Sequence, residues 1–99
     1  MFNLFGSKVK KAIKSGAVII DLRAAGAFDQ GRIPGSINIP VDRLAINIGK
    51  IKSFKRPIVL CSSQTSDIDK AMRLLRSEGI SNIINGGNWE SLLAKVKRW

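Results

Sequence analysis

The sequence predicts an α/β domain in which helices cover both faces of a parallel sheet. Short, continuous apolar runs rich in β-branched residues are typical of strands buried on both faces. These runs alternate with segments whose apolar residues recur at helical spacing, which is the pattern of a strand–helix–strand fold. The chain has 99 residues, of which 44% are apolar and 24% charged. This length and composition suit one globular domain over residues 1–99.

The first elements expected are a helix over residues 7–15 and a buried strand over residues 17–20. The apolar residues of the helix share one side while lysines occupy the other, and Gly16 is a common residue type after a helix end. Asp21 and Arg23 follow the strand directly, so the sequence places two charges at its carboxyl end.

The middle of the chain is expected to hold a one-turn helix at residues 24–28, a loop at 30–35 and a short strand at 36–39. The strand alternates polar and apolar residues and ends before Pro40. Residues 41–50 predict a helix, although their apolar residues recur with a mixed period.

Four further elements complete the predicted sheet and its covering layers. Residues 58–61 predict a second buried strand, and a helix with a clear apolar stripe follows the polar segment after it and ends at Gly79. Residues 83–84 predict a third buried strand. A last helix follows, with Trp89 on its apolar side.

Histidine is absent and cysteine occurs once, which limits the kinds of catalytic and metal site that the chain can form. Without histidine the chain lacks the usual general base, the commonest zinc ligand and a Ser-His-Asp triad. A single cysteine cannot form an intramolecular disulfide, which suits a reducing compartment. The sequence has no run of about 20 apolar residues and no secretory leader pattern at its start. It therefore predicts a cytoplasmic protein without a membrane span and without a metal site.

Cys61 is the leading candidate for chemistry because it ends a predicted strand. Ligands of open parallel sheets bind beyond the carboxyl ends of the strands, and here the polar segment 62–66 leads into a helix N-terminus. Free backbone N–H groups at such a terminus favour an anion, including a thiolate, and would lower the pKa of the thiol. The alternative is that Cys61 is a small buried apolar residue, a common fate of free cysteine.

The chain resembles a single-domain rhodanese in a series of segments that keep the family's order and spacing. Members of that family typically show D-x-R, G-H-I-P-G-A, C-x-x-G-x-R-S, A-x-x-x-L-x-x-x-G and G-G-x-x-W. The corresponding residues here are Asp21 and Arg23, the segment 31–36, Cys61, then Ala71, Leu75 and Gly79, and finally Gly86, Gly87 and Trp89. The resemblance implies a three-layer α/β/α sandwich around a mostly parallel five-stranded sheet, as in the related cell-cycle phosphatases. Its fifth, edge strand would come from residues 2–5.

The resemblance also implies sulfur transfer without a metal or organic cofactor. Cys61 would attack the sulfane sulfur of thiosulfate or of another persulfide and pass it from its own persulfide to a thiol or to cyanide. Supporting roles fall on Asp21 and Arg23, which would order the loop region, and on Arg32, which replaces the family's histidine and could attract an anionic donor. The backbone amides that would cradle the sulfur belong to Ser62, Ser63, Gln64, Thr65 and Ser66.

Three departures from the family pattern leave two alternatives open. Gln64 stands where the family has glycine, Ser66 stands where it has a basic residue, and Gly79 lies 18 positions after Cys61, one more than the family spacing. One alternative is an inactive rhodanese module that acts by protein binding. The other is a lengthened cysteine loop that binds an arsenate- or phosphate-like anion, although Asp67 stands where such loops end in arginine and would repel the anion. We expect Asp67 or Ser66 to support the loop instead by capping the following helix.

The charge balance is strongly basic, with 17 Lys and Arg against seven Asp and Glu and a net charge of +10. The basic residues form three clusters that are far apart in sequence, and none belongs to a nucleic-acid-binding motif. This distribution favours a solubilising surface that attracts an anionic sulfur donor or an acidic partner protein. Specific binding of nucleic acid is not favoured.

Overall fold

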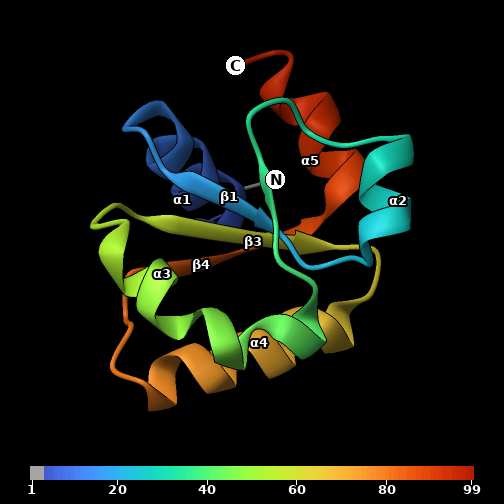
Figure 1. The fold of residues 1–99 in the computed structure, drawn as a ribbon. Coiled ribbons are helices and arrows are strands. Elements are labelled where there is room, and N and C mark those ends of the chain that lie inside the picture. Colours follow the sequence, from blue (N-terminus) through green and yellow to red (C-terminus); the bar gives the residue numbers. More distant parts are fainter. Residues whose placement is uncertain (1–3) are drawn as a thin grey trace.

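A computed structural model describes the backbone from Leu4 to Trp99 and the side chains from Lys8 onward, and it confirms the α/β class (Figure 1). Its sheet contains four parallel strands in the order β2-β1-β3-β4. The strands are β1 (Val18–Asp21), β2 (Ile37–Asn38), β3 (Ile58–Ser62) and β4 (Ile83–Asn88).

Helices cover both faces of this sheet. The helices α1 (Leu4–Lys14) and α5 (Trp89–Val96) pack on one face, whereas α3 (Ile48–Ser53) and α4 (Thr65–Ser77) pack on the other (Figure 1). The short helix α2 (Ala25–Gln30) follows β1 at the end of the sheet. The result is the three-layer sandwich that the resemblance implied.

The sheet of the described residues has four strands rather than the five expected. The fifth strand was assigned to residues 2–5, but α1 already begins at Leu4, and residues 2 and 3 lie outside the described part. The physical reason is the helical spacing of Val9 and Ala12, which face the sheet while the neighbouring lysines face solvent.

The single helix predicted over residues 41–50 is also wrong, because the structure has three shorter elements in this region. Two 3-10 turns, η1 (Val41–Arg43) and η2 (Ala45–Asn47), precede α3. Leu44, between the two turns, is fully buried. The mixed apolar period of this segment thus corresponds to two tight turns rather than to a continuous helix.

Alternation along β3 divides the core into two clusters. Ile58 and Leu60 belong to the cluster beneath α3 and α4, whereas Val59 and Cys61 belong to the cluster beneath α1 and α5. Successive side chains of a strand point to opposite faces, so the parity of a residue in β3 determines which layer it enters.

No helix in the described part of the chain combines the length and the apolar character that a bilayer crossing requires.

Gly86 in β4 provides a test of the packing between the sheet and α5. A Cβ atom at this position would lie 2.6 Å from Val59 Cγ1 and 2.9 Å from the Leu60 carbonyl oxygen. We expect Gly86→Ala to lower the free energy of unfolding by about 1–3 kcal/mol through overpacking, measured by urea denaturation. The control is Gly26→Ala in α2, where a Cβ atom meets nothing within 4 Å, so that the better helix former should leave stability unchanged or raise it. Equal effects of the two substitutions would contradict the packing described.

Candidate active site

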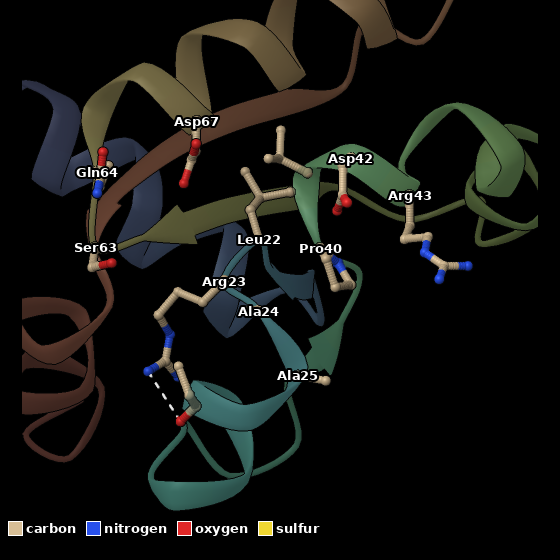
Figure 2. A pocket seen from close by; sticks show the side chains of 12 residues that line it. Leu22, Arg23, Ala24, Ala25, Pro40, Asp42, Arg43, Ser63, Gln64 and Asp67 are labelled. Carbon is tan, nitrogen blue, oxygen red and sulfur yellow. Dashed lines mark hydrogen bonds between the residues drawn. The ribbon is translucent and has the colours of Figure 1, made fainter.

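The candidate site is the edge of the sheet where β1 and β3 end. Asp21 pairs in register with Cys61 at this edge, and Ser62 is the last residue of β3. A hollow of about 510 Å³ opens beyond the strand ends. Its polar lining, shown in Figure 2, consists of Arg23, Asp42, Arg43, Ser63, Gln64 and Asp67.

Cys61 does not line this hollow. Its side chain is 0% exposed and packs with Ile19, Ile33, Val59 and Leu92 in the apolar cluster beneath α1 and α5. Burial raises the pKa of the Cys61 thiol from its ordinary value of 9.0 to about 12, the Asp21 carboxylate adds to the rise, and Arg23 opposes it. The thiol is therefore neutral at physiological pH.

The expectation that a helix N-terminus lowers the pKa of Cys61 is wrong, and the parity of β3 explains why. The helix α4 packs against the face of the sheet that Ile58 and Leu60 occupy, whereas Cys61 points to the opposite face. Cys61 is also the penultimate residue of β3 and not its last. Its sulfur thus lies away from the positive end of the helix dipole.

Ser62 is the last residue of β3, and its side chain contacts α4. It is 1% exposed, and its hydroxyl group donates a hydrogen bond to Asp67 Oδ2 at 3.1 Å. Asp67, in the first turn of α4, lines the hollow. The Asp67 carboxylate therefore accepts a hydrogen bond from the Ser62 hydroxyl group instead of capping α4. The N-cap residue of α4 is Gln64, and its side chain makes no capping hydrogen bond.

The predicted loop over residues 62–66 contains only two residues between strand and helix. Ser63 and Gln64 link β3 to α4 and line the hollow, whereas Thr65 and Ser66 already belong to α4. Gln64 has a φ of −131°, which any L-residue adopts without strain. A lengthened anion-binding loop is thus absent between Cys61 and Asp67.

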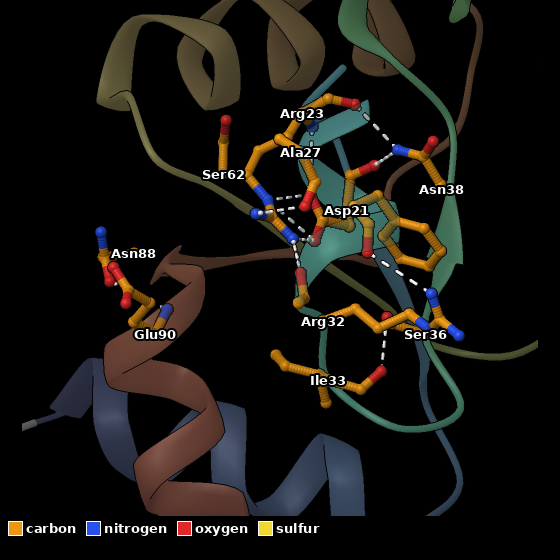
Figure 3. Close-up of polar contacts among 12 residues, drawn as sticks. Asp21, Arg23, Ala27, Arg32, Ile33, Ser36, Asn38, Ser62, Asn88 and Glu90 are labelled. Atoms are coloured by element: carbon orange, nitrogen blue, oxygen red, sulfur yellow. Dashed lines mark hydrogen bonds and ion pairs between the residues drawn. The ribbon is translucent and has the colours of Figure 1, made fainter. Parts of the chain in front are cut away.

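Asp21 and Arg23 form a buried ion pair that joins three segments (Figure 3). Arg23 Nη2 lies 2.8 Å from Asp21 Oδ2 and donates a second hydrogen bond, of 2.7 Å, to the Gly31 carbonyl oxygen. The guanidinium carbon also lies 3.9 Å from the centre of the Trp89 ring, a cation–π distance. The pair thereby holds the end of β1 against the loop after α2 and the start of α5.

Arg32, which was expected to attract an anionic donor, lies outside the hollow. It is exposed, stacks at 5.1 Å over the Phe28 ring and does not line the hollow. The structure instead brings Asp42 and Arg43 to the hollow, two residues that the sequence pattern did not indicate. The signal was Pro40, because the residues directly after a strand-ending proline must lie at the carboxyl edge of a parallel sheet.

Comparison with known proteins relates this geometry to a family. The model of the Rhodanese-like domain family matches residues 6–90. The chain belongs to the rhodanese-like domain family. No curated protein matches the sequence. At the level of the family, membership supports sulfurtransferase activity.

Three solved structures have the same fold. The human single-domain sulfurtransferase TSTD1 is 24% identical to this chain, with a TM-score of 0.72. The match covers 90% of this chain and 92% of that chain. The Saccharomyces cerevisiae single-domain sulfurtransferase RDL2 is 22% identical, with a TM-score of 0.66 and coverages of 90% and 85%. A Rhodanese_3-like domain from Anabaena sp. is 25% identical, with a TM-score of 0.62 and coverages of 84% and 92%.

The one-residue discrepancy in spacing has a structural counterpart in this rhodanese-like domain. The family spacing, counted back from Gly79, ends at Ser62 and not at Cys61. Ser62 is also the residue whose side chain leaves the apolar cluster and contacts Asp67. The additional residue between Cys61 and Gly79 thus coincides with a serine at the strand end.

The raised pKa of Cys61 predicts how the stability of this rhodanese-like domain changes in alkaline solution. An unfolded thiol ionises near 9.0 and the folded thiol near 12, so the stability contributed by the neutral thiol is complete below pH 9 and is lost as the pH rises towards 12. We expect the wild type to lose about 2–3 kcal/mol more than Cys61→Ala between pH 8 and pH 11, measured by urea denaturation. Parallel pH profiles of the two proteins would contradict the burial of the thiol.

Removing Arg23 should destabilise the domain because Asp21 would remain buried without its partner. We expect Arg23→Leu to cost about 3–5 kcal/mol in the free energy of unfolding. The matched control is Arg32→Leu, which removes an exposed arginine and should change stability by less than about 0.5 kcal/mol. A small effect of Arg23→Leu in denaturant titrations would show that the pair does not hold these segments together.

Proposed function

We propose that this rhodanese-like domain is a catalytically silent module that acts by binding, and not a thiosulfate sulfurtransferase that works through Cys61. The observation that carries the proposal is the position of the thiol. Cys61 is fully buried in the apolar cluster beneath α1 and α5, burial raises its pKa to about 12, and the hollow at the strand ends is lined without it.

The chemistry of sulfur transfer supports this proposal. A thiolate must attack the outer sulfur of thiosulfate, so that an S–S bond forms with the enzyme, the S–S bond of the donor breaks and sulfite leaves with its electron pair. Cys61 is the single cysteine of the sequence, and the residue at the strand end is Ser62. A serine hydroxyl group is a poor nucleophile at its free pKa and cannot form the disulfide-type bond of a persulfide.

The second candidate is sulfur transfer from thiosulfate or a persulfide to a thiol or to cyanide, with Cys61 as the carrier. Family membership and the position of Cys61 one residue from the strand end favour it. It would require the end of β3 to open so that the thiol reaches the hollow. Binding of an arsenate- or phosphate-like anion has less support, because the loop is short and the carboxylates of Asp42 and Asp67 line the hollow.

Intact mass spectrometry after incubation with thiosulfate separates the two candidates. We expect no gain of one sulfur between about pH 6 and 9, a range in which a thiol of pKa 12 remains protonated. Iodoacetamide should label Cys61 only after denaturation, and Cys61→Ser should remain unlabelled throughout. A sulfur adduct on the native wild type that is absent from Cys61→Ser would establish the sulfurtransferase instead.

The single unpaired cysteine suits a cytoplasmic location for this module, which we include in the proposal. Cell fractionation with an antibody to the chain tests it.

A further inference from the structure

Ile46 is a large apolar side chain that a rigid turn presents to solvent. Its exposed fraction is 76%, and among residues 8–99 no other large apolar side chain is as exposed. The turn is anchored, since Leu44 is fully buried and Asn47 Nδ2 donates a 2.8 Å hydrogen bond to the Arg43 carbonyl oxygen. Isolated exposed apolar residues are common, so the surroundings of Ile46 must decide whether it has a role.

Those surroundings combine a hollow with unpaired positive charge. A hollow of about 380 Å³ lies beside Ile46, and its charged lining residues are Arg43 and Lys50 without any carboxylate. Within the side chains described, the single ion pair is that of Asp21 and Arg23, so Arg43 and Lys50 form no ion pair there. In Figure 2 the Arg43 side chain extends away from Asp67. We call the residues Ala25, Pro40, Arg43, Ile46 and Lys50 the Ile46 surface.

We propose that the Ile46 surface docks an acidic peptide segment of a partner protein. One apolar side chain of the peptide would lie on Ile46, Ala25 and Pro40, and its carboxylates would lie beside Arg43 and Lys50. This inference rests on the proposed binding function and specifies the surface and the chemistry of the partner.

Charge complementarity and lining chemistry favour this occupant over other polyanions. The domain carries a net charge of +10, which speeds the approach of an acidic partner. No aromatic side chain lines the hollow beside Ile46, whereas single-stranded nucleic acid is bound largely by stacking on aromatic residues. A membrane surface would require a broad apolar helix face, and this surface exposes a single isoleucine.

NMR titration of the ¹⁵N-labelled full chain tests the proposal. The probe is a synthetic peptide with one leucine between two pairs of glutamates and with both ends blocked. We expect saturable shifts of the amides of residues 43–50 and of Ala25, and we expect Ile46→Ser and Arg43→Gln each to weaken binding at least about fivefold. Because Ile46 is exposed, Ile46→Ser should unfold at the same temperature as wild type.

Two controls isolate the surface. Lys97→Gln removes the same charge as Arg43→Gln, but Lys97 follows α5 on the opposite face of the sheet, so it should bind the peptide as wild type does. The same peptide with serine in place of leucine should bind at least about fivefold more weakly. Equal binding by wild type and Ile46→Ser, or shifts spread over all basic clusters, would overturn the proposal. Tighter binding of a single-stranded DNA oligonucleotide to residues 43–50 would also overturn it.

The outcomes separate this inference from the proposed function. A gain of sulfur by Cys61 would reject the catalytically silent module and would leave the peptide titration unchanged. Equal affinities of wild type and Ile46→Ser would reject the docking surface and would say nothing against the burial of the thiol.

Discussion

The alternation of side chains along β3 is the constraint on which the site depends. Both faces of the sheet are covered, so each residue of the strand enters one of two apolar layers or lies at the strand end. A shift of one residue exchanges the two layers. Cys61 and Ser62 are neighbours in sequence, yet one lies among apolar side chains beneath α1 and α5 and the other contacts Asp67. One position therefore separates a side chain in an apolar layer from one that hydrogen-bonds to α4.

The buried ion pair of Asp21 and Arg23 holds three segments together at the same end of the sheet. Its hydrogen bonds connect β1 to the Gly31 loop (Figure 3). The stack of Arg23 on Trp89 connects the same pair to α5. Because the pair is almost fully buried and satisfied, Arg23 has little capacity left for a ligand. The carboxylate also lies close enough to Cys61 to disfavour a second negative charge. The feature that orders this edge of the fold thus also keeps the thiol neutral.

The sequence was sufficient for the fold and insufficient for the site, for a physical reason. Continuous apolar runs and helical stripes report burial summed over several residues, and they predicted β1, β3, α4 and α5. The orientation of Cys61 depends on a single register step that apolar periodicity does not resolve when both faces are buried. The Ile46 surface was out of reach because it depends on two tight turns that the mixed period did not reveal.

Two routes lead from the buried thiol to a thiolate, and their costs can be compared. The folded thiol has a pKa of about 12, which lies about five units above pH 7. Ionising it directly at pH 7 therefore costs roughly 7 kcal/mol. If the end of β3 first opens, the exposed thiol has a pKa near 9.0, about two units above pH 7. Its ionisation then costs roughly 3 kcal/mol in addition to the cost of opening. Opening is therefore the cheaper route whenever it costs less than about 4 kcal/mol. It must break the pairing of Cys61 with Asp21, the 2.9 Å hydrogen bond from the Leu22 amide to the Cys61 carbonyl oxygen and the Ser62–Asp67 bond. Any reactivity of Cys61 would consequently report the local stability of this strand end rather than an activated nucleophile.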